Sequence, residues 1–501
     1  MKKNDSEQSY NHILKYTGIF GGVQGLNILI GLVRNKIVAM LLGPMGMGLT
    51  SLFNSVVNFI SQSTNLGISF SAVRHVSELF DQGDEERIRH FVKVVRAWSL
   101  LTALLGMLVC VMAGPILSNK TFSWGDHTLH FILLAPAIGL LAITGGETAI
   151  LKGARQLKSL AVIQLISIFV ALVISVPIYY FFGQAGIVPV IVLMALSTML
   201  LTIRHSFRLY PLQLTGKKGI LGEGMEMVRL GIAFTLTGVM ATGADMFIRS
   251  YLNVTTDLDM VGLYNVGYTL TMTYGGMVFV AMETDYFPRL SSLVFQVDKA
   301  NVMVNRQIEV SLLIIGPMLV AILFAVPFII PLLFTREFMP VEGMIRYTTL
   351  ALYLRAMKLP VAYIALARGD GKNYMLLEGL YYVGMVFAII LGSKYDGLTG
   401  TGKGLLLLSA AEFVLLYVFT FFKYHYRPTT IIFVYGGIHL LIGVVGLLLS
   451  FYLTGWAYWI AAVVVTAVSA SFSIFVLHRK SSLWQKLKQK LLHQFGRKAS
   501  N

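Results

Sequence analysis

Long apolar runs recur from one end of this 501-residue chain to the other. A helix of about 18 or more such residues is long enough to cross the ~30 Å hydrocarbon layer of a bilayer. Charged residues make up 13% of the chain, whereas soluble domains carry about 25%, and the mean hydropathy is +0.72. The runs therefore predict an all-α polytopic membrane protein.

We place about 14 transmembrane helices, separated by polar, glycine-rich or proline-containing breaks. The predicted spans are residues 16–42, 46–75, 93–117, 128–151, 159–182, 184–203, 225–252, 261–287, 307–334, 343–367, 373–393, 403–422, 430–454 and 456–477. The polar N-terminal segment lacks the features of a signal peptide, so we expect the first span to be retained. Cys110 is the single cysteine, which excludes a disulfide within the chain.

The Lys and Arg residues of the short loops fall overwhelmingly on one side if both termini are cytoplasmic. The outer loops then hold only Lys120, Arg336, Lys394 and Lys403. This distribution accounts for the net charge of +16 without any nucleic acid partner. The basic C-terminal tail has an amphipathic pattern, and it lies either on the anionic inner leaflet or in solvent.

The chain resembles itself at an offset of 214–215 residues. Gly48-Leu49 matches Gly262-Leu263, and Arg34 matches Arg249. An even number of spans lies within each period, which predicts two parallel six-helix lobes related by a pseudo-two-fold axis. We therefore expect an N-terminal lobe over residues 1–210, a C-terminal lobe over 211–426, a terminal helix pair over 427–478 and a basic tail over 479–501.

The stretch GLVRNKIVAMLLGPMGMGL, residues 31–49, places Arg34 in the outer part of the first span. Gln24, Asn27, Gly31 and Arg34 share one helical face. The next span carries a similar stripe that includes Asn54 and Asn58, and a stripe in the seventh span ends at Asp245 and Arg249. Such stripes are typical either of close helix packing or of the wall of a wet cavity.

Arg355 and Lys358 share a face near the middle of the tenth span, where a charge is expensive and usually functional. Arg34 and Arg249 lie nearer the outer surface and could instead reach the headgroups. We predict a cation-rich cavity that suits a phosphate group. Its predicted ligands are the following residues: Arg34, Asn54, Asn58, Arg249, Arg355 and Lys358. Asp245, Glu412 and Glu147 are candidates for coupling to H⁺ or Na⁺, or for structural ion pairs.

The segments GLVRNKIVAMLLGPMGMGL, NLGISFSAVRHVSEL, KGARQLKSLA and METDYFPRLSSL resemble Wzx-type O-antigen flippases. These belong to the multidrug/oligosaccharidyl-lipid/polysaccharide exporter superfamily. The first segment is also similar to that of the lipid II flippase MurJ family, whose functional arginine would correspond to Arg34. Asn35 replaces that family's aspartate, and Ser61-Gln62 replaces its arginine pair, which favours the O-antigen branch.

The resemblance implies a flippase that moves an undecaprenyl-diphosphate-linked oligosaccharide from the cytoplasmic to the periplasmic leaflet of the bacterial inner membrane by alternating access. It implies membrane lipids as surroundings, and the polymerase and chain-length regulator of the same pathway as partners. The alternatives are a multidrug or cation antiporter of the same superfamily and a polytopic lipid-linked-sugar transferase or polymerase. A positive cavity would favour the flippase, and a negative one the antiporter.

Two motifs with a catalytic appearance do not support an enzyme. Residues 397–404 imitate a phosphate-binding loop, but Gly404 stands where a Ser or Thr must bind Mg²⁺. Asp257 and Asp259 have a metal-binding spacing, but they fall in a short predicted outer loop, away from cytoplasmic nucleotide sugars. We therefore expect no enzymatic activity, no cofactor and no metal.

Overall fold

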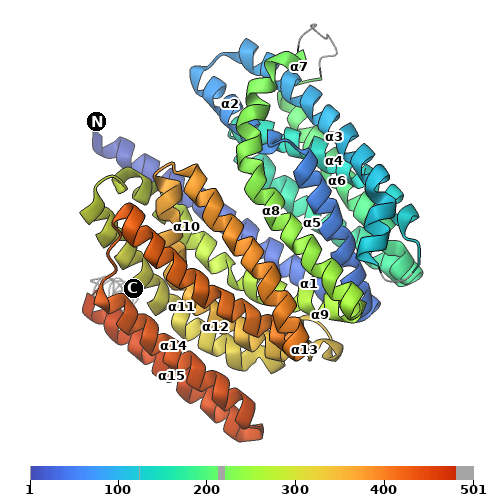
Figure 1. The fold of residues 1–501 in the computed structure, drawn as a ribbon. Helices are drawn as coiled ribbons and strands as arrows, with labels where there is room; N and C mark the ends of the chain where they lie inside the picture. The colour runs from blue at the N-terminus through green and yellow to red at the C-terminus, as the bar shows by residue number, and fades with distance from the viewer. Residues whose placement is uncertain (1, 123–124, 213–219, 481–501) are drawn as a thin grey trace, which may run out of the picture. The chain divides into compact units, whose positions relative to one another are not determined.

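The computed structural model describes residues 2–122, 125–212 and 220–480. Over residues 2–25 and at a few other positions it describes the backbone but not the side chains. The C-terminal tail from residue 481, predicted to be amphipathic, lies outside these residues. The described part is helical and contains no strand (Figure 1). The all-α prediction is confirmed.

The α-helices are bounded as follows: α1 Lys2–Thr64, α2 Ile68–Gln82, α3 Glu85–Thr121, α4 Thr128–Gly153, α5 Leu157–Phe182, α6 Ile187–Leu209, α7 Ile220–Glu223, α8 Met225–Thr255, α9 Leu258–Tyr268, α10 Met277–Leu293, α11 Val297–Leu333, α12 Val341–Ala367, α13 Gly371–Tyr424, α14 Thr430–Tyr452 and α15 Gly455–Lys480. Short 3₁₀ turns cover Gly183–Gly186 and Arg336–Phe338, and a π-helical turn covers Thr269–Gly275. Across the described residues, nine stretches are long and apolar enough to cross a membrane.

Three of those stretches each cover two predicted spans in whole or in part. In α1 the break falls at Gly43, whose φ of 62° suits glycine, and Pro44 starts the next helical segment. In α13 it falls at Asp396 and Gly397, where φ is −149° and 50°. Both breaks lie where the sequence predicts them. The third stretch joins α5 to α6 through Gly183–Gly186.

The prediction of one continuous span over residues 46–75 is wrong. The helix ends at Thr64, and α2 begins at Ile68 after Leu66 and Gly67 adopt positive φ angles of 51° and 72°. The backbone of Gly67 lies directly against that of Gly231 in α8. A side chain at either position would overlap the other backbone, so the turn and the packing require each other.

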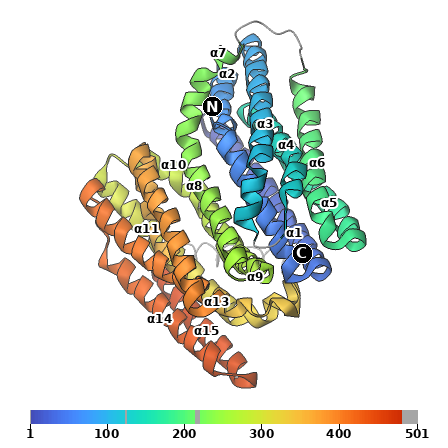
Figure 2. The same cartoon turned by 45° about the vertical axis from the view of Figure 1, so that its right-hand side comes forward.

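The chain forms two compact units. Unit 1 comprises residues 1–265 with 330–338, and unit 2 comprises 266–329 with 339–501. In unit 1, α3, α4 and α6 pack side by side (Figures 1 and 2), and one end is filled by a cluster that includes Ile88, Val95 and Ile150. The division into lobes at residue 210 stays a prediction.

Unit 2 is built around α11 and α12. Leu323, Val361 and Ile432 belong to its buried core, which also draws on α10, α13 and α15. Helices α14 and α15 lie side by side (Figures 1 and 2). His439 of α14 is buried between Ser469 and Ser473 of α15, 3.3 Å from each hydroxyl. These polar contacts hold the predicted terminal helix pair together.

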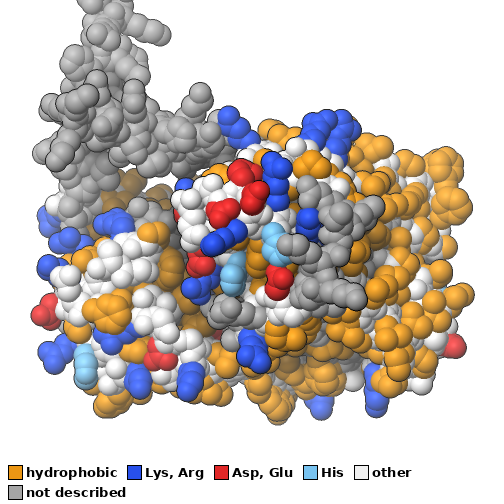
Figure 3. Space-filling model, turned by 90° about the horizontal axis from the view of Figure 1, so that it is seen from above, with side chains coloured by type: hydrophobic (Ala, Val, Ile, Leu, Met, Phe, Trp, Pro, Cys, Tyr) orange, Lys and Arg blue, Asp and Glu red, His pale blue; other side chains and the backbone are white. Residues whose placement is uncertain are grey.

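One face of the described residues is shown in Figure 3. Charged side chains are visible near the centre of this view and along its left and lower edges, whereas hydrophobic side chains cover most of its right-hand side.

Asp370 caps α13 at one helix junction. The hydrogen bond from the Asn373 side chain, with another from Tyr424, holds the pKa of that carboxyl below its usual range.

Within unit 1, α1 and α9 cross at two glycines that the sequence repeat pairs. A Cβ atom on Gly48 would overlap the carbonyl oxygen of Leu258, and one on Gly262 would overlap that of Pro44. The added atoms would also lie 2.9 and 3.0 Å from the backbone nitrogens of Gly262 and Gly48, respectively. The contact is reciprocal, because each glycine lies against the carbonyl group of the residue four positions before the other glycine.

We expect Gly48→Ala and Gly262→Ala to destabilise the protein by similar amounts, about 1–3 kcal/mol each, since each methyl group forces the two backbones apart. Thermal unfolding in detergent would measure this. Gly437→Ala in α14 is the matched control, because its Cβ would meet nothing within 4 Å. A loss for Gly48→Ala no larger than the control's would contradict the close crossing.

Candidate functional site

The charged side chains inside the predicted spans fall into one set in each unit. Unit 1 holds Arg34, Lys36, Glu147, Asp245 and Arg249, and unit 2 holds the residues of α12 and α13. Each set is described by itself. In both, helix breaks and close packing bring polar atoms to the charged groups.

Arg34 precedes the break in α1 and is half-buried. Its Nε donates to the hydroxyl of Ser175 at 3.2 Å, and a terminal nitrogen lies 3.5 Å from the sulfur of Met194. These partners lie on α5 and α6. Arg34 therefore points into the packing of unit 1 rather than only toward an outer surface.

Lys36 lies two residues further along α1 and has a different role. Its Nζ donates to the carbonyl oxygen of Pro331 at 2.5 Å and to that of Phe334. These two carbonyl groups lie at the C-terminal end of α11. A helix leaves its last carbonyl oxygens without an intrahelical donor, and the cation of Lys36 supplies one. Sequence reasoning noted the charge of Lys36 but missed this function.

Arg249 is buried in α8 and contacts several neighbours, among them the ring of Tyr264. It forms an ion pair with Asp245 one turn earlier, its Nε lies 2.5 Å from the hydroxyl of Ser51, and a terminal nitrogen lies 3.1 Å from the amide oxygen of Asn265. Ser51 and Asn265 are themselves separated by the repeat offset. Arg249 thus links α8 to both helices of the glycine crossing.

The two predicted asparagine ligands lie in the second half of α1. The amide of Asn54 donates to the carbonyl of Thr50 at 2.9 Å, within its own helix, and Asn58 is exposed. Neither forms a described hydrogen bond to Arg34 or Arg249. Their role as substrate ligands stays a prediction.

Glu147 lies in a closed network inside unit 1. Its carboxylate accepts from Arg96 at 2.8 and 3.3 Å and from Ser206 at 2.5 Å, while Arg96 also donates to the carbonyl of Tyr210 at 2.9 Å. Arg96 also lies over the ring of Phe207. Glu147 is therefore held as a structural partner of Arg96.

Sequence reasoning did not single out Arg96, which lies in the first turn of the third predicted span. The available signal was its position at the start of an apolar run. A charge that packs inside a helix bundle needs a buried partner. The sequence alone did not identify Glu147, which lies on another helix, as that partner.

In unit 2, Lys358 of α12 forms an ion pair with Glu412 in the second half of α13. Its Nζ also lies 5.1 Å from the ring centre of Tyr381 in the first half. Arg355, one turn earlier, lies over the ring of Phe279. The charge of Arg355 repels that of Lys358, and Glu378 attracts it.

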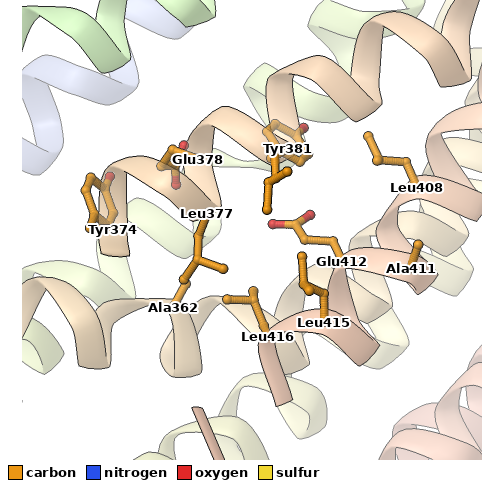
Figure 4. A pocket seen from close by; sticks show the side chains of 11 residues that line it. Ala362, Tyr374, Leu377, Glu378, Tyr381, Leu408, Ala411, Glu412, Leu415 and Leu416 are labelled. Atoms are coloured by element: carbon orange, nitrogen blue, oxygen red, sulfur yellow. The ribbon is translucent and has the colours of Figure 1, made fainter. Parts of the chain in front are cut away.

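A cavity of about 400 Å³ opens beside this ion pair, between the two halves of α13 and the end of α12. The lining residues are Ala362, Tyr374, Leu377, Glu378, Leu380, Tyr381, Leu408, Ala411, Glu412, Leu415 and Leu416. In Figure 4 the carboxylate of Glu412 points into this space, facing the helix that carries Leu377 and Tyr381. The wall is thus mainly apolar with two carboxylates, and Lys358 is held at its edge by Glu412.

This arrangement differs from the cation-rich cavity that the sequence predicts. Lys358 and Arg249 are each paired with a carboxylate. Glu412 and Asp245 therefore each form an ion pair with a cation. Of the two roles predicted for them, ion coupling and structural pairing, this contact is the one that structural pairing requires. A phosphate would have to replace a carboxylate at Lys358 or Arg249, so anion binding and release of that carboxylate would be linked.

Comparisons with known proteins confirm the resemblance seen in the sequence. The lipid III flippase of Escherichia coli K12 is 23% identical over 375 residues, which cover 72% of this chain and 86% of the flippase. The same figures hold for the lipid III flippase of Shigella flexneri.

Two solved structures share the fold. Lipid II flippase MurJ, in an inward closed conformation, matches 92% of this chain and 99% of its own length with a TM-score of 0.71 at 13% identity. An inward-facing multidrug resistance MATE family transporter of the MOP superfamily matches 80% of this chain and 94% of its own, with a TM-score of 0.67 at 16% identity. These relatives are flippases and transporters.

The sequence profile of one family covers more than half of the chain, residues 37–342. That range extends from the first predicted span into the beginning of α12 and includes Arg249. By this match, the chain belongs to the polysaccharide biosynthesis protein family.

Proposed function

We propose that this protein is a flippase that moves an undecaprenyl-diphosphate-linked oligosaccharide from the cytoplasmic to the periplasmic leaflet of the bacterial inner membrane. The observation that carries the proposal is the buried cation Lys358, held by a carboxylate that an anion could replace. Family membership and the similarity to the lipid III flippase support the class of substrate. Both termini are proposed to be cytoplasmic.

In this proposal, the diphosphate of the lipid carrier is the group that the cations recognise. Phosphate accepts several charge-assisted hydrogen bonds, and guanidinium groups match its geometry. Binding at Lys358 displaces Glu412, and the freed carboxylate must then gain a proton or a Na⁺ ion to remain in an apolar wall. This exchange would link substrate binding to an ion gradient.

Alternating access is proposed to use the glycine crossing of α1 and α9. The two backbones meet there without intervening side chains, so the contact can separate without repacking a core. Arg249 contacts Ser51 and Asn265 on either side of the crossing. Its exchange of Asp245 for phosphate would connect the state of the crossing to the ligand.

A second candidate function is a multidrug or cation antiporter, which the carboxylates of the unit 2 cavity favour. Glu378 and Glu412 line it, and no Lys or Arg is among its described lining residues. The fold is also that of a MATE transporter. The two functions differ in the accumulated compound, because loss of a flippase retains a lipid-linked glycan inside the cell and loss of an antiporter retains a drug cation.

Deletion of the gene should cause a lipid-linked oligosaccharide to accumulate on the cytoplasmic side of the inner membrane, since its synthesis continues without export. Mass spectrometry of extracted lipids, with protease or lectin access in spheroplasts and inverted vesicles, would identify the glycan and its leaflet. Increased retention of ethidium with normal glycan export would instead establish the antiporter.

The Lys358–Glu412 pair allows a test that separates folding from transport. Lys358→Ala should lower protein levels, because it leaves a buried carboxylate without its cation, a loss of about 3–5 kcal/mol. The double variant Lys358→Met with Glu412→Gln removes both charges and should restore the protein level. If Lys358 binds substrate phosphate, export should still fall at least tenfold in the double variant.

The matched control is Lys403→Met with Asp396→Asn, which removes an exposed ion pair within α13, the helix that carries Glu412. That variant should keep both its protein level and its export. Normal export by the Lys358/Glu412 double variant at a normal protein level would show that the pair is structural only.

The repeat predicts that Arg34 and Arg249 act on one ligand. Arg34→Gln and the pair Arg249→Gln with Asp245→Asn should each reduce export, and the triple variant should be no worse than the poorer of the two, since both changes remove contacts to the same group. Export assays normalised to protein level would measure this. Independent, multiplying losses in the triple variant would contradict a shared ligand.

A further inference from the structure

A second cavity in unit 2 lies away from the ion pair, where the end of α10 faces the first turns of α11. It has a volume of about 540 Å³. Its lining residues are Tyr286, Arg289, Leu293, Asp298, Lys299, Val302, Met303, Arg306, Gln307 and Val310. The count of Lys and Arg in the loops predicts that this helix junction is cytoplasmic.

The polar part of the wall is basic. Arg289 projects from α10, and Lys299 and Arg306 project from one face of α11, two turns or about 10 Å apart. Asp298 is the single acidic residue of the lining, so the site has a net charge of two positive. All three basic side chains are exposed, and Gln307 adds an amide that can donate. Such a set suits a phosphate group.

The rest of the wall is apolar and continues along α11. Val302 is 50% exposed, Val310 is 41% exposed, and Ile314 extends the same stripe one turn further. Along α11 the lining alternates between charged and apolar residues, and only beyond Arg306 and Gln307 does the stripe become apolar, at Val310 and Ile314. A bilayer changes in that direction where phosphate headgroups give way to acyl chains.

Hydrogen bonds and buried side chains hold α10 and α11, the two helices that line this cavity, against the rest of unit 2. The hydroxyl of Tyr286 donates to the carbonyl of Pro360 at 2.8 Å, and Leu290 of α10 is fully buried. On α11, the amide of Asn305 donates to the carbonyl of Arg427 at 3.0 Å, while its oxygen accepts from Tyr426 at 2.8 Å. The two helices are thus held in place while their basic side chains face outward.

We propose that this cavity binds the phosphate of an anionic phospholipid of the inner leaflet, with the upper part of its acyl chains along Val310 and Ile314. The bound lipid is a resident of the membrane and not the transported molecule. Basic pockets between membrane helices at the cytoplasmic surface suit such headgroups. The proposal concerns a site separate from Lys358.

Native mass spectrometry of the full-length protein from nanodiscs tests the proposal. Discs of phosphatidylcholine with a minor fraction of phosphatidylglycerol should yield protein that retains phosphatidylglycerol. The double variant Arg289→Gln with Arg306→Gln should retain it about 30-fold less, because two of the three cations are lost. Its thermal unfolding in pure phosphatidylcholine discs should match the wild type, since both side chains are exposed.

The matched control is Lys372→Gln with Lys423→Gln, which removes the same charge from exposed positions of the same unit outside the cavity. It should retain the lipid as the wild type does. Equal losses in both double variants would overturn the proposal, because the attraction would then be a general effect of net charge.

Two competitors distinguish the source of the phosphate. Undecaprenyl diphosphate and inorganic phosphate are each added to the discs before release of the protein. Neither should displace phosphatidylglycerol at equal concentration. Displacement by undecaprenyl diphosphate would place the cavity on the transport route, displacement by inorganic phosphate would make it a free-anion site, and either result would overturn the proposal of a resident lipid.

Discussion

The high free-energy cost of a charge within an apolar helix governs much of this structure. Arg96, Arg249 and Lys358 each face a carboxylate on their own or another helix. The Arg96–Glu147 and Lys358–Glu412 pairs join segments that are distant in sequence, whereas Arg249 and Asp245 lie one turn apart in α8. A buried charge left without its partner would be strongly destabilising, so the packing of these helices depends on the pairs.

The three pairs differ in how completely they are enclosed. Glu147 accepts hydrogen bonds from Arg96 and from Ser206, and the arginine is further tied to the backbone at Tyr210. Glu412, in contrast, borders a cavity of about 400 Å³. A carboxylate that can move into an open space can release its partner, whereas one surrounded by donors cannot. The geometry therefore distinguishes an enclosed pair from a pair that borders open space.

Features that depend on local sequence were predictable. Hydropathy identified the nine long apolar stretches of the described residues, and the breaks at Gly43 and Gly397 followed from glycine and proline placement. Features that depend on two distant segments were not. Nothing near Lys358 indicates Glu412, which is 54 residues later, and the turn at Gly67 exists because Gly231 lies against it. Apolar periodicity alone extended the second span through that turn.

The crossing of Gly48 and Gly262 has the form of an isologous contact, in which the first member touches the second as the second touches the first. Two separate copies of one chain would form the same contact across a dimer axis. In a single chain, the two segments that cross here can differ in sequence, but neither can carry a side chain larger than that of glycine at the point of contact. A bulkier residue on one side cannot be offset by a smaller one on the other, because glycine already occupies both positions. The junction can therefore be lost by one mutation but not repaired by a second mutation at its partner.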